Sequence, residues 1–247
     1  MAESIAFITG GDRGLGFSLC KGLLARGWRV FAGQYMHEWT DLDGLVKLYP
    51  QLLTPIALDV TVQDSVQAAA SEVAKLADHV DVLINNAGVI SMGTNERTIR
   101  DGQDYGELYR VFDVNAVGPI RVMEAFMPLL ERSQVRRLCF VSSESGSIGR
   151  CERTTWYGYN MSKTALNMAV KIMFNDLRPQ GYTFRLYHPG WMRTYMSGKK
   201  NTAADLEPDE AAVPALSYFL SGIGAEPSAV NEDVLVMRDN LGRDWPW

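Results

Sequence analysis

The stretch Ser4-Ile5-Ala6-Phe7-Ile8-Thr9-Gly10-Gly11-Asp12-Arg13-Gly14-Leu15-Gly16 decides how this chain folds. Its first half is a short apolar run typical of a buried strand, and its second half is a glycine-rich turn that leads into a helix-period segment. Glycines allow a tight turn and let a pyrophosphate approach backbone N–H groups, to which a helix N-terminus adds its positive end. The stretch therefore predicts a dinucleotide-binding strand, turn and helix, with a purely structural turn as the alternative.

The same alternation of short apolar runs and longer helix-period segments continues along the chain. The predicted strands are residues 4–9, 28–34, 53–58, 80–85, 137–142, 183–188 and 233–237. The predicted helices lie near residues 14–26, 40–48, 62–78, 104–132, 156–178 and 208–221. Continuous apolar strands that alternate with helices predict a parallel sheet covered on both faces. We expect one α/β domain over residues 1–247, a doubly wound Rossmann fold with a mostly or wholly parallel seven-stranded sheet flanked by helices.

Two segments have the composition of long loops. Residues 91–103 are polar and contain Gly93 and Gly102, and residues 195–208 are polar up to Pro208, which opens a helix. Long loops in a compact domain are often functional. We expect 195–208 to cover a substrate, whereas 91–103 fits a substrate loop and a plain surface excursion equally well.

Composition and charge exclude several classes of function. The 247 residues carry a formal charge of −5, which gives no basic footprint for nucleic acid. No run of about 18 apolar residues predicts a membrane span, and no secretion signal precedes the first strand. The three cysteines, Cys20, Cys139 and Cys151, match no zinc or redox spacing. We therefore expect reduced thiols, no metal site and a cytoplasmic location.

Tyr159 and Lys163 form a candidate acid/base pair in a segment that is predicted to be helical. A spacing of four residues places both side chains on one face, one turn apart. A neighbouring ammonium lowers the pKa of a phenol from its usual value of about 10. The spacing alone is weak support, since chance supplies roughly 0.3 such pairs in a chain of this composition. Tyr157 lacks a lysine four residues on, where the chain has Met161.

Polar and glycine-containing motifs lie at the ends of the predicted strands and in the long predicted helix. They are Asp59, Asn85-Asn86-Ala87-Gly88, Val114-Asn115-Ala116, Ser142-Ser143-Glu144-Ser145-Gly146 and His188-Pro189-Gly190-Trp191-Met192-Arg193-Thr194. Together with the glycine-rich turn and the Tyr159/Lys163 pair, these motifs resemble those of the short-chain dehydrogenase/reductase superfamily, in its single-domain branch. The resemblance covers nearly the whole chain. Three stretches resemble small carbonyl-reductase-like enzymes of the sniffer and C-factor type: Tyr159-Asn160-Met161-Ser162-Lys163, His188-Pro189-Gly190-Trp191, and Asp239-Asn240-Leu241-Gly242 with Pro246-Trp247.

The resemblance implies a catalytic group of four residues and a reversible hydride transfer. Tyr159 would exchange a proton with the oxygen of a ketone, aldehyde or secondary alcohol. Lys163 would lower the pKa of Tyr159 and bind the nicotinamide ribose. Ser143, rather than Ser142, would hold the substrate oxygen, and Asn115 would kink its helix and support a water. Without the motifs, Asn115 would be an ordinary buried amide and Ser143 a strand-end cap.

The resemblance also implies a set of cofactor contacts. In isolation, Asp59 is more simply a helix N-cap, and Pro189, Gly190 and Thr194 are turn residues. The implied contacts are Gly10, Asp12, Arg13, Gly14, Leu15, Gly16, Gln34, Tyr35, Asp59, Val60, Asn86, Ala87, Gly88, Tyr159, Lys163, Pro189, Gly190, Trp191, Met192 and Thr194.

The end of the second predicted strand bears on the choice between NAD(H) and NADP(H). NAD enzymes of this type place an acidic residue there to bind the ribose 2′-OH, but this chain has Gln34 followed by Tyr35. NADP enzymes often have an arginine next to that position, which is also missing. Arg13 in the glycine-rich turn could bind a 2′-phosphate, although a solvated loop charge is the alternative. We therefore favour NADP(H) over NAD(H).

The substrate side contains apolar residues that suggest an apolar, aromatic or alicyclic carbonyl compound. The expected pocket residues are Ser145, Trp156, Tyr157, Trp191 and Met196. A nucleotide-binding regulator or scaffold without turnover is one alternative, and an epimerase or dehydratase is another. Relatives with the latter chemistry usually carry an additional substrate domain. The family also forms homodimers and homotetramers through the helices near 104–132 and 156–178, although monomers occur.

Overall fold

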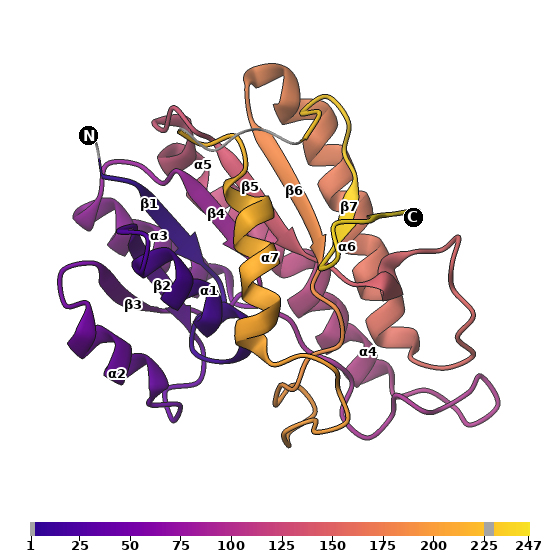
Figure 1. Ribbon diagram of the computed structural model, residues 1–247. Coiled ribbons are helices and arrows are strands. Elements are labelled where there is room, and N and C mark those ends of the chain that lie inside the picture. The colour runs from indigo at the N-terminus through magenta and orange to yellow at the C-terminus, as the bar shows by residue number, and fades with distance from the viewer. Residues whose placement is uncertain (1–2, 225–229) are drawn as a thin grey trace.

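Eight strands form one sheet in the order β3-β2-β1-β4-β5-β6-β7-β8 (Figure 1). The computed structural model describes residues 3–224 and 230–247, so residues 1–2 and 225–229 of the predicted domain lie outside it. The strands are β1 Ile5–Ile8, β2 Arg29–Gln34, β3 Leu53–Ala57, β4 Val82–Asn85, β5 Arg137–Val141, β6 Thr183–His188, β7 Met237–Asp239 and β8 Asp244–Trp245. Within the described residues, neighbouring strands are parallel except β7 and β8.

The predicted doubly wound α/β fold is confirmed. The sheet has one strand more than predicted, because the two-residue strand β8 is too short to show in the sequence pattern. Strand β7 begins at Met237, where the predicted strand 233–237 ends. In the interior of the sheet, β1 lies between β2 and β4, so the strand order reverses beside β1. In open α/β sheets the ligand crevice lies at such a reversal, at the carboxyl ends of the strands.

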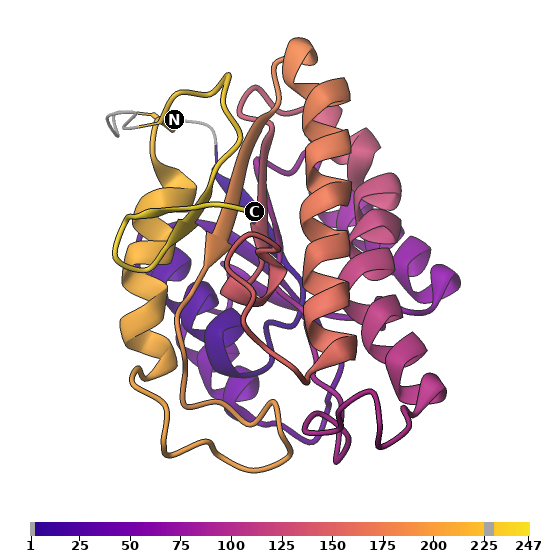
Figure 2. The ribbon, with the colours of Figure 1, turned by 90° about the vertical axis from the view of Figure 1, so that its right-hand side faces the viewer.

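Helices cover both faces of the sheet (Figure 2). The α-helices are α1 Gly14–Leu24, α2 Asp41–Leu48, α3 Gln63–Leu76, α4 Tyr105–Phe112, α5 Gly118–Glu131, α6 Tyr157–Leu177 and α7 Pro208–Leu220. Helices α1, α2 and α7 pack on one face, and α3, α5 and α6 pack on the other. Helix α4 lies against α6, at the lower end of the layer formed by α3, α5 and α6 in Figure 1.

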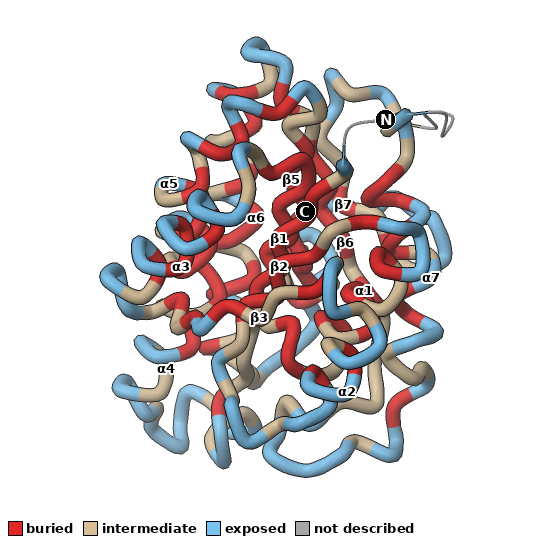
Figure 3. The backbone as a smooth tube through the Cα atoms, turned by 90° about the vertical axis from the view of Figure 1, so that its left-hand side faces the viewer, coloured by how far each residue is buried: buried red, intermediate tan, exposed pale blue. Residues whose placement is uncertain are grey.

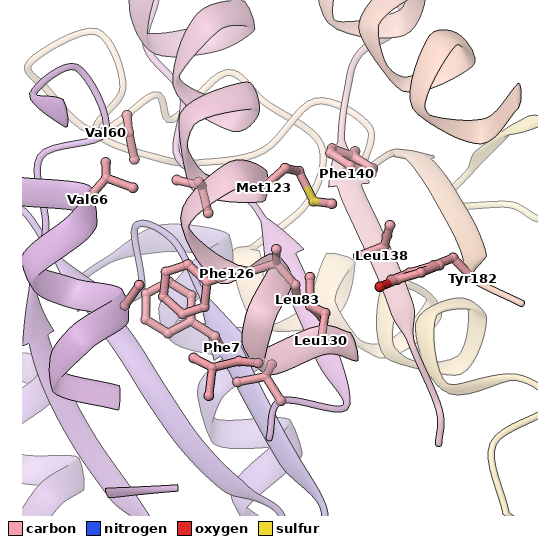
Figure 4. Packing of buried hydrophobic residues seen from close by; sticks show 14 of the residues in the cluster. Phe7, Val60, Val66, Leu83, Met123, Phe126, Leu130, Leu138, Phe140 and Tyr182 are labelled. Atoms are coloured by element: carbon pink, nitrogen blue, oxygen red, sulfur yellow. The ribbon is translucent and has the colours of Figure 1, made fainter. Parts of the chain in front are cut away.

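Alternation along β1 supplies both hydrophobic cores. Ile5 and Phe7 face the α3/α5/α6 layer, whereas Ala6 and Ile8 face the α1/α7 layer, and all four are buried. The rings of Phe7 and Phe126 lie 4.1 Å apart between their centroids (Figure 4). Buried residues therefore concentrate along the sheet, while the outer helix faces remain exposed (Figure 3).

The long helix predicted over 104–132 is interrupted. Helix α4 ends at Phe112, the π-helical turn η1 spans Asp113–Val117, and α5 begins at Gly118. A π-turn inserts one extra residue into a helix and occurs frequently at functional sites. Gly118 lies against Val60, since a Cβ at residue 118 would approach the Val60 side chain to 3.0 Å. The missing side chain of Gly118 therefore lets the start of α5 approach the loop after β3 closely.

Two buried arginines fasten the C-terminus of α7 to the sheet. Arg137 donates to the carbonyl oxygens of Phe219 and Ser221 at 2.5 and 3.0 Å, and Arg185 donates to the carbonyl oxygen of Tyr218 at 3.0 Å. Arg185 also forms two hydrogen bonds with the Glu232 carboxylate, at 2.6 and 2.8 Å. Guanidinium groups at this end satisfy helix carbonyls and complement the helix dipole.

Across residues 3–224 and 230–247, no helix has the length and apolar character needed to cross a bilayer. In the same residues, His, Cys, Asp and Glu side chains form no group of three or more that could hold a metal ion. Cys20 and Cys139 are buried free thiols, and Cys151 is an exposed one.

Candidate active site

The predicted site residues gather at the carboxyl ends of the central strands. The glycine-rich turn follows β1, Asn86 follows β4, Ser143 follows β5 and Pro189 follows β6. Since these four strands are neighbours in the sheet, residues far apart in the sequence meet at one edge. Asn115 lies in η1, and Tyr159 and Lys163 lie in the first two turns of α6.

The geometry of the turn after β1 requires glycine at several positions. Gly10 and Gly14 have φ angles of +65° and +56°, in the left-handed region that favours glycine. A Cβ at Gly16 would lie 1.9 Å from the Gly10 carbonyl oxygen. Helix α1 begins at Gly14 without a side-chain hydrogen bond from its N-cap, Arg13. Its first N–H groups are therefore not capped by that side chain and can meet an anion.

Asn86 and Thr9 hold this turn against the end of β4. The Asn86 Nδ2 donates to the carbonyl oxygens of Thr9 and Gly10 at 2.9 and 3.0 Å. The Thr9 Oγ1 accepts hydrogen bonds from the backbone N–H groups of Asn86 and Ala87, both at 2.9 Å. Sequence reasoning did not single out Thr9, although its position directly before the glycines was a usable signal.

Asp12 and Arg13 contact the segment after β2. The buried Asp12 carboxylate accepts a hydrogen bond from the Met36 backbone at 3.0 Å. The Arg13 guanidinium lies 5.3 Å from the ring centre of Trp39, a residue that the sequence did not single out. The ring of Tyr195, from the loop 195–208, meets Trp39 edge-on at 4.9 Å. Arg13 is therefore held at the end of the sheet where Gln34 terminates β2.

The remaining predicted cofactor residues divide between exposed and internal positions. Tyr35 is 63% exposed, whereas Leu15, in the first turn of α1, is buried in the hydrophobic core. The Asp59 carboxylate accepts hydrogen bonds from the backbone and hydroxyl of Thr61 at 2.8 and 2.6 Å. The carbonyl of the buried Val60 accepts a hydrogen bond from Arg121. Asp59 thus stabilises its own turn and does not cap α3, whose N-cap is Val62, so the alternative of a helix N-cap is wrong.

Lys163 is buried directly behind the Tyr159 ring. Its Nζ lies 5.8 Å from the ring centre and donates to the carbonyl oxygen of Val141 at 2.9 Å. Burial disfavours the charged form and lowers the pKa of Lys163 to about 8. The amine therefore titrates close to neutral pH.

The pKa of Tyr159 differs from the sequence-based expectation. Desolvation raises the pKa of the phenol to about 12, and a hydrogen bond with Ser143 opposes this rise. Lys163 is not among the groups that shift this pKa, and its amine donates to the Val141 carbonyl oxygen, so the expected lowering by Lys163 is wrong for this arrangement. The phenol therefore keeps its proton at neutral pH.

The two adjacent serines after β5 have different surroundings. The Ser142 Oγ donates to Asn167 Oδ1 at 2.6 Å inside the core. The Ser143 Oγ accepts a hydrogen bond from the Ser145 backbone at 3.2 Å and lies within hydrogen-bonding reach of Tyr159. Of the two serines, only Ser143 therefore places its hydroxyl beside the Tyr159 phenol.

Asn115 joins the loop after β4 to helix α6. Its side-chain amide exchanges two hydrogen bonds with the Val89 backbone, both at 2.8 Å, and donates to Ser162 Oγ at 3.0 Å. The Ser162 Oγ in turn donates to the Tyr159 carbonyl at 2.8 Å. Gly88 lies between Asn115 and Lys163, since a Cβ at residue 88 would be 3.4 Å from Asn115 Oδ1 and 3.6 Å from Lys163 Nζ.

Trp156 forms one wall beside Tyr159. Its ring meets the Tyr159 ring edge-on at 6.1 Å, and its Nε1 donates to Glu96 Oε1 at 2.8 Å. Its φ of +66° is unusual for a bulky residue, and such strain clusters at functional sites. The bond to Glu96 places the loop 91–103 at the site.

The loop after β6 carries further predicted site residues. Trp191 is 55% exposed, and Met192 forms an isolated bridge with Leu206. Gly190 has a φ of +83°. Thr194 lies against Gly14, because a Cβ at residue 14 would be 3.5 Å from Thr194 Cγ2. Tyr157 and Met196, both expected in the pocket, are partly buried, and Ser145 is buried.

This fold and arrangement of residues match a known family. The family model described as short chain dehydrogenase matches residues 4–205. The chain belongs to the short-chain dehydrogenases. It is therefore an NAD(P)-dependent oxidoreductase of the dehydrogenase/reductase type. The predicted resemblance to this superfamily, and to its carbonyl-reductase-like members, is confirmed.

Individual relatives of this short-chain dehydrogenase cover most of its length. An uncharacterized oxidoreductase of Schizosaccharomyces pombe is 34% identical in an alignment of 245 positions that covers 97% of this chain and 91% of the relative. The C-signal protein of Myxococcus xanthus is 38% identical over 168 residues, 68% of this chain and 93% of the relative. The crystal structure of NADPH-bound carbonyl reductase from chicken fatty liver superposes with a TM-score of 0.85, at 25% identity over the whole of both chains.

Proposed function

We propose that this enzyme transfers a hydride between nicotinamide C4 and the carbon of a ketone, an aldehyde or a secondary alcohol, with Tyr159 as the general acid/base. The proposal is carried by one observation: the Tyr159 phenol and the Ser143 hydroxyl meet, with the Lys163 amine behind them, at the strand ends beside the glycine-rich turn. Two hydroxyl groups that converge there can hold a single substrate oxygen between them.

The residues around the glycine-rich turn fit a dinucleotide. Gly10 and Gly14 have left-handed backbones, and the start of α1 lacks a side-chain cap, so backbone N–H groups are available to a pyrophosphate. Gly88 leaves room beside Asn115 and Lys163, where a larger residue would intrude. A nicotinamide cofactor would supply the hydride. Lys163 and the turn Pro189–Thr194 are the residues we propose for its nicotinamide end.

Proton transfer is the contribution that we assign to the protein itself. A phenol with a pKa of about 12 is fully protonated at neutral pH, which is the form required to protonate a carbonyl oxygen during reduction. Oxidation requires the phenolate, which is scarce under the same conditions. We therefore expect reduction to be the favoured direction at neutral pH. Lys163, with its pKa of about 8, can return a proton to this site between turnovers.

The residues near the end of β2 favour NADP(H) over NAD(H). Gln34 and Tyr35 place no carboxylate where a 2′-phosphate would be repelled, and Arg13 offers a guanidinium held over Trp39. The similar carbonyl reductase of chicken fatty liver is described as NADPH bound, which supports the same choice.

The substrate that we propose is an apolar carbonyl compound. The Trp156 ring lies edge-on beside Tyr159. Trp191 and Met196 lie in the loop after β6, and β6 ends next to β5 at the same edge of the sheet, so we expect aromatic and aliphatic side chains near the reacting oxygen. The loops 91–103 and 195–208 approach each other, since a Cβ at Gly198 would be 3.1 Å from Met92 Cε. We propose that these loops together cover the substrate.

We also propose that the enzyme forms a homodimer or homotetramer. Helix α6 exposes Met161, Met168 and Ile172 on one face, by 54%, 60% and 61%. The neighbouring α4 exposes Tyr105 and Tyr109, by 66% and 72%. Exposed apolar side chains gathered on adjacent helices are typical of protein interfaces. Light scattering coupled to gel filtration would show a dimer or tetramer mass, and a monomer at micromolar concentration would contradict this part of the proposal.

A spectrophotometric screen tests the function. Ketones, aldehydes and alcohols would be offered with NADH and NADPH in parallel, and absorbance at the reduced nicotinamide band would be followed. We expect NADPH oxidation with apolar ketones or aldehydes. Cofactor binding without turnover across the whole panel would instead favour a regulator or scaffold, and a strict preference for small charged substrates would overturn the proposed substrate class.

A further inference from the structure

An ion pair lies directly beside the proposed catalytic residues. Glu144 follows Ser143 in the short 3-10 turn η2 Glu144–Gly146. Its carboxylate is bonded through both oxygens to Arg153, with Arg153 Nη1 to Oε2 at 2.8 Å and Nη2 to Oε1 at 2.7 Å. Arg153 Nη1 also lies 3.3 Å from the Ser145 hydroxyl. A two-point carboxylate–guanidinium contact fixes orientation as well as distance.

Arg153 also contacts the aromatic wall of the site. Its guanidinium carbon lies 5.8 Å from the centre of the Trp156 ring, on which the cation can rest. Trp156 is held from its other side by the Glu96 carboxylate and by the Asn95 carbonyl, which accepts from the Trp156 backbone at 2.8 Å. These contacts hold the Trp156 ring edge-on to the Tyr159 ring. A continuous chain of contacts leads from Glu144 to the proposed proton donor.

The two charges act on Tyr159 in opposite directions. The Glu144 carboxylate raises the pKa of the phenol, and the Arg153 guanidinium lowers it. Ser143 from the end of β5 and Lys163 from α6 are the other polar groups around the phenol. His188, at the end of β6, lies close enough to Glu144 and Arg153 to be influenced by both charges. While the pair is intact, its two effects on the pKa of Tyr159 oppose each other.

We propose that Glu144 and Arg153 are positioning residues that act as one neutral unit, holding Trp156 against Tyr159 and keeping net charge away from the phenol. This inference rests on the proposed role of Tyr159. Stability is a weak reason for the pair, because both side chains are about one third exposed and exposed ion pairs contribute little to folding. The pair instead lies next to Ser143, which we propose holds the reacting oxygen, so a role at the active site explains its position better.

The test compares Glu144→Gln, Arg153→Gln, the double variant and Arg153→Lys. The alkaline limb of the pH profile of carbonyl reduction would be measured, together with the ionisation of Tyr159 in the cofactor-free protein by NMR of ζ-¹³C-tyrosine. The Tyr159→Phe variant assigns the NMR signal. Arg178→Gln, which removes an ion pair with Asp233 elsewhere in the molecule, is the matched control.

Opposite shifts are the expected signature. Glu144→Gln leaves a cation beside the phenol and should move both readouts to lower pH by about half a unit to one unit. Arg153→Gln should move them to higher pH, and the double variant should return close to the wild type. Arg153→Lys keeps the charge but loses the forked contact, so it should retain the pH profile while raising the KM of the carbonyl substrate several-fold.

Shifts of the same sign in both single variants, or no shift in either, would overturn the inference. So would an Arg153→Lys variant with the pH profile of Arg153→Gln. A Tyr159→Phe variant that retains activity would contradict the proposed function instead. In that case the NMR shifts would still decide whether the pair balances charge at Tyr159.

Discussion

Replacing Gly16 by alanine should displace the backbone of the glycine-rich turn. The new Cβ would lie 1.9 Å from the carbonyl oxygen of Gly10 and 2.5 Å from Nδ2 of Asn86. Ordinary van der Waals contact begins at 3.4 Å, so the Gly10 oxygen would have to retreat by about 1.5 Å. Because that oxygen belongs to the backbone, no side-chain rotation can relieve the clash.

The size of the effect follows from three contributions. Overpacking of this kind costs about 1–3 kcal/mol. The Asn86 hydrogen bond to Gly10, 3.0 Å long, would be weakened, at a cost of about 1 kcal/mol. Replacing a helical glycine by alanine returns about 0.5–1 kcal/mol. The free energy of unfolding should therefore fall by about 1–3 kcal/mol, and cofactor affinity should fall at least tenfold because the pyrophosphate turn is displaced.

Gly44→Ala provides the matched control, since Gly44 is also helical but a Cβ there would meet none of the described residues within 4 Å. It should raise the free energy of unfolding by about 0.5–1 kcal/mol and leave cofactor binding unchanged. Urea denaturation and calorimetric titration of NADP⁺ would measure both quantities for the two variants. Wild-type stability and wild-type affinity in Gly16→Ala would refute the reasoning about the turn.

Three further predictions concern the catalytic and cofactor residues. Tyr159→Phe should lower kcat of carbonyl reduction by at least about 10²-fold while cofactor affinity is kept, and near wild-type turnover on every active substrate would count against the assignment. Because the phenol is protonated below a pKa of about 12, initial rates of reduction should be nearly constant between pH 6 and 7, below the titration of Lys163. Alcohol oxidation should rise with pH over the same range, by up to about tenfold per unit, and falling oxidation would have the wrong sign. Arg13→Gln should raise the KM for NADPH about tenfold or more and leave that for NADH almost unchanged, whereas equal effects on both cofactors would argue against a 2′-phosphate contact.

The fold was largely predictable because its signals are local. The apolar run Ile5–Ile8 alternates its side chains between two hydrophobic layers, and the glycine-rich turn marks the junction with α1. The π-turn at Asp113–Val117 leaves no mark in the helical periodicity, and only the resemblance, which implies a kink at Asn115, indicated an interruption there. The short strand β8 was missed because two residues carry no periodicity.

The site was predictable where residues carry a motif, and not where they meet only in space. Ser143, Tyr159 and Lys163 stand in recognisable runs, but their contact depends on α6 packing against η2, the turn that follows β5. Glu144 and Arg153 lie nine residues apart in an irregular segment, where no periodicity predicts that they pair. Trp39 and Tyr195 come from different loops and meet only because both loops lie at the same edge of the sheet.

The sequence by itself determined the α/β alternation, the cofactor turn and the identity of the residues at the strand ends, because glycine content, apolar periodicity and motif order are properties of neighbouring residues. The tertiary structure decided how those residues behave. Burial raised the pKa of Tyr159 and lowered that of Lys163, since desolvation depends on what surrounds a group rather than on its sequence neighbours. Arg185 likewise lies inside a buried strand only because Glu232 and the end of α7, distant in the chain, satisfy its charge and its N–H groups.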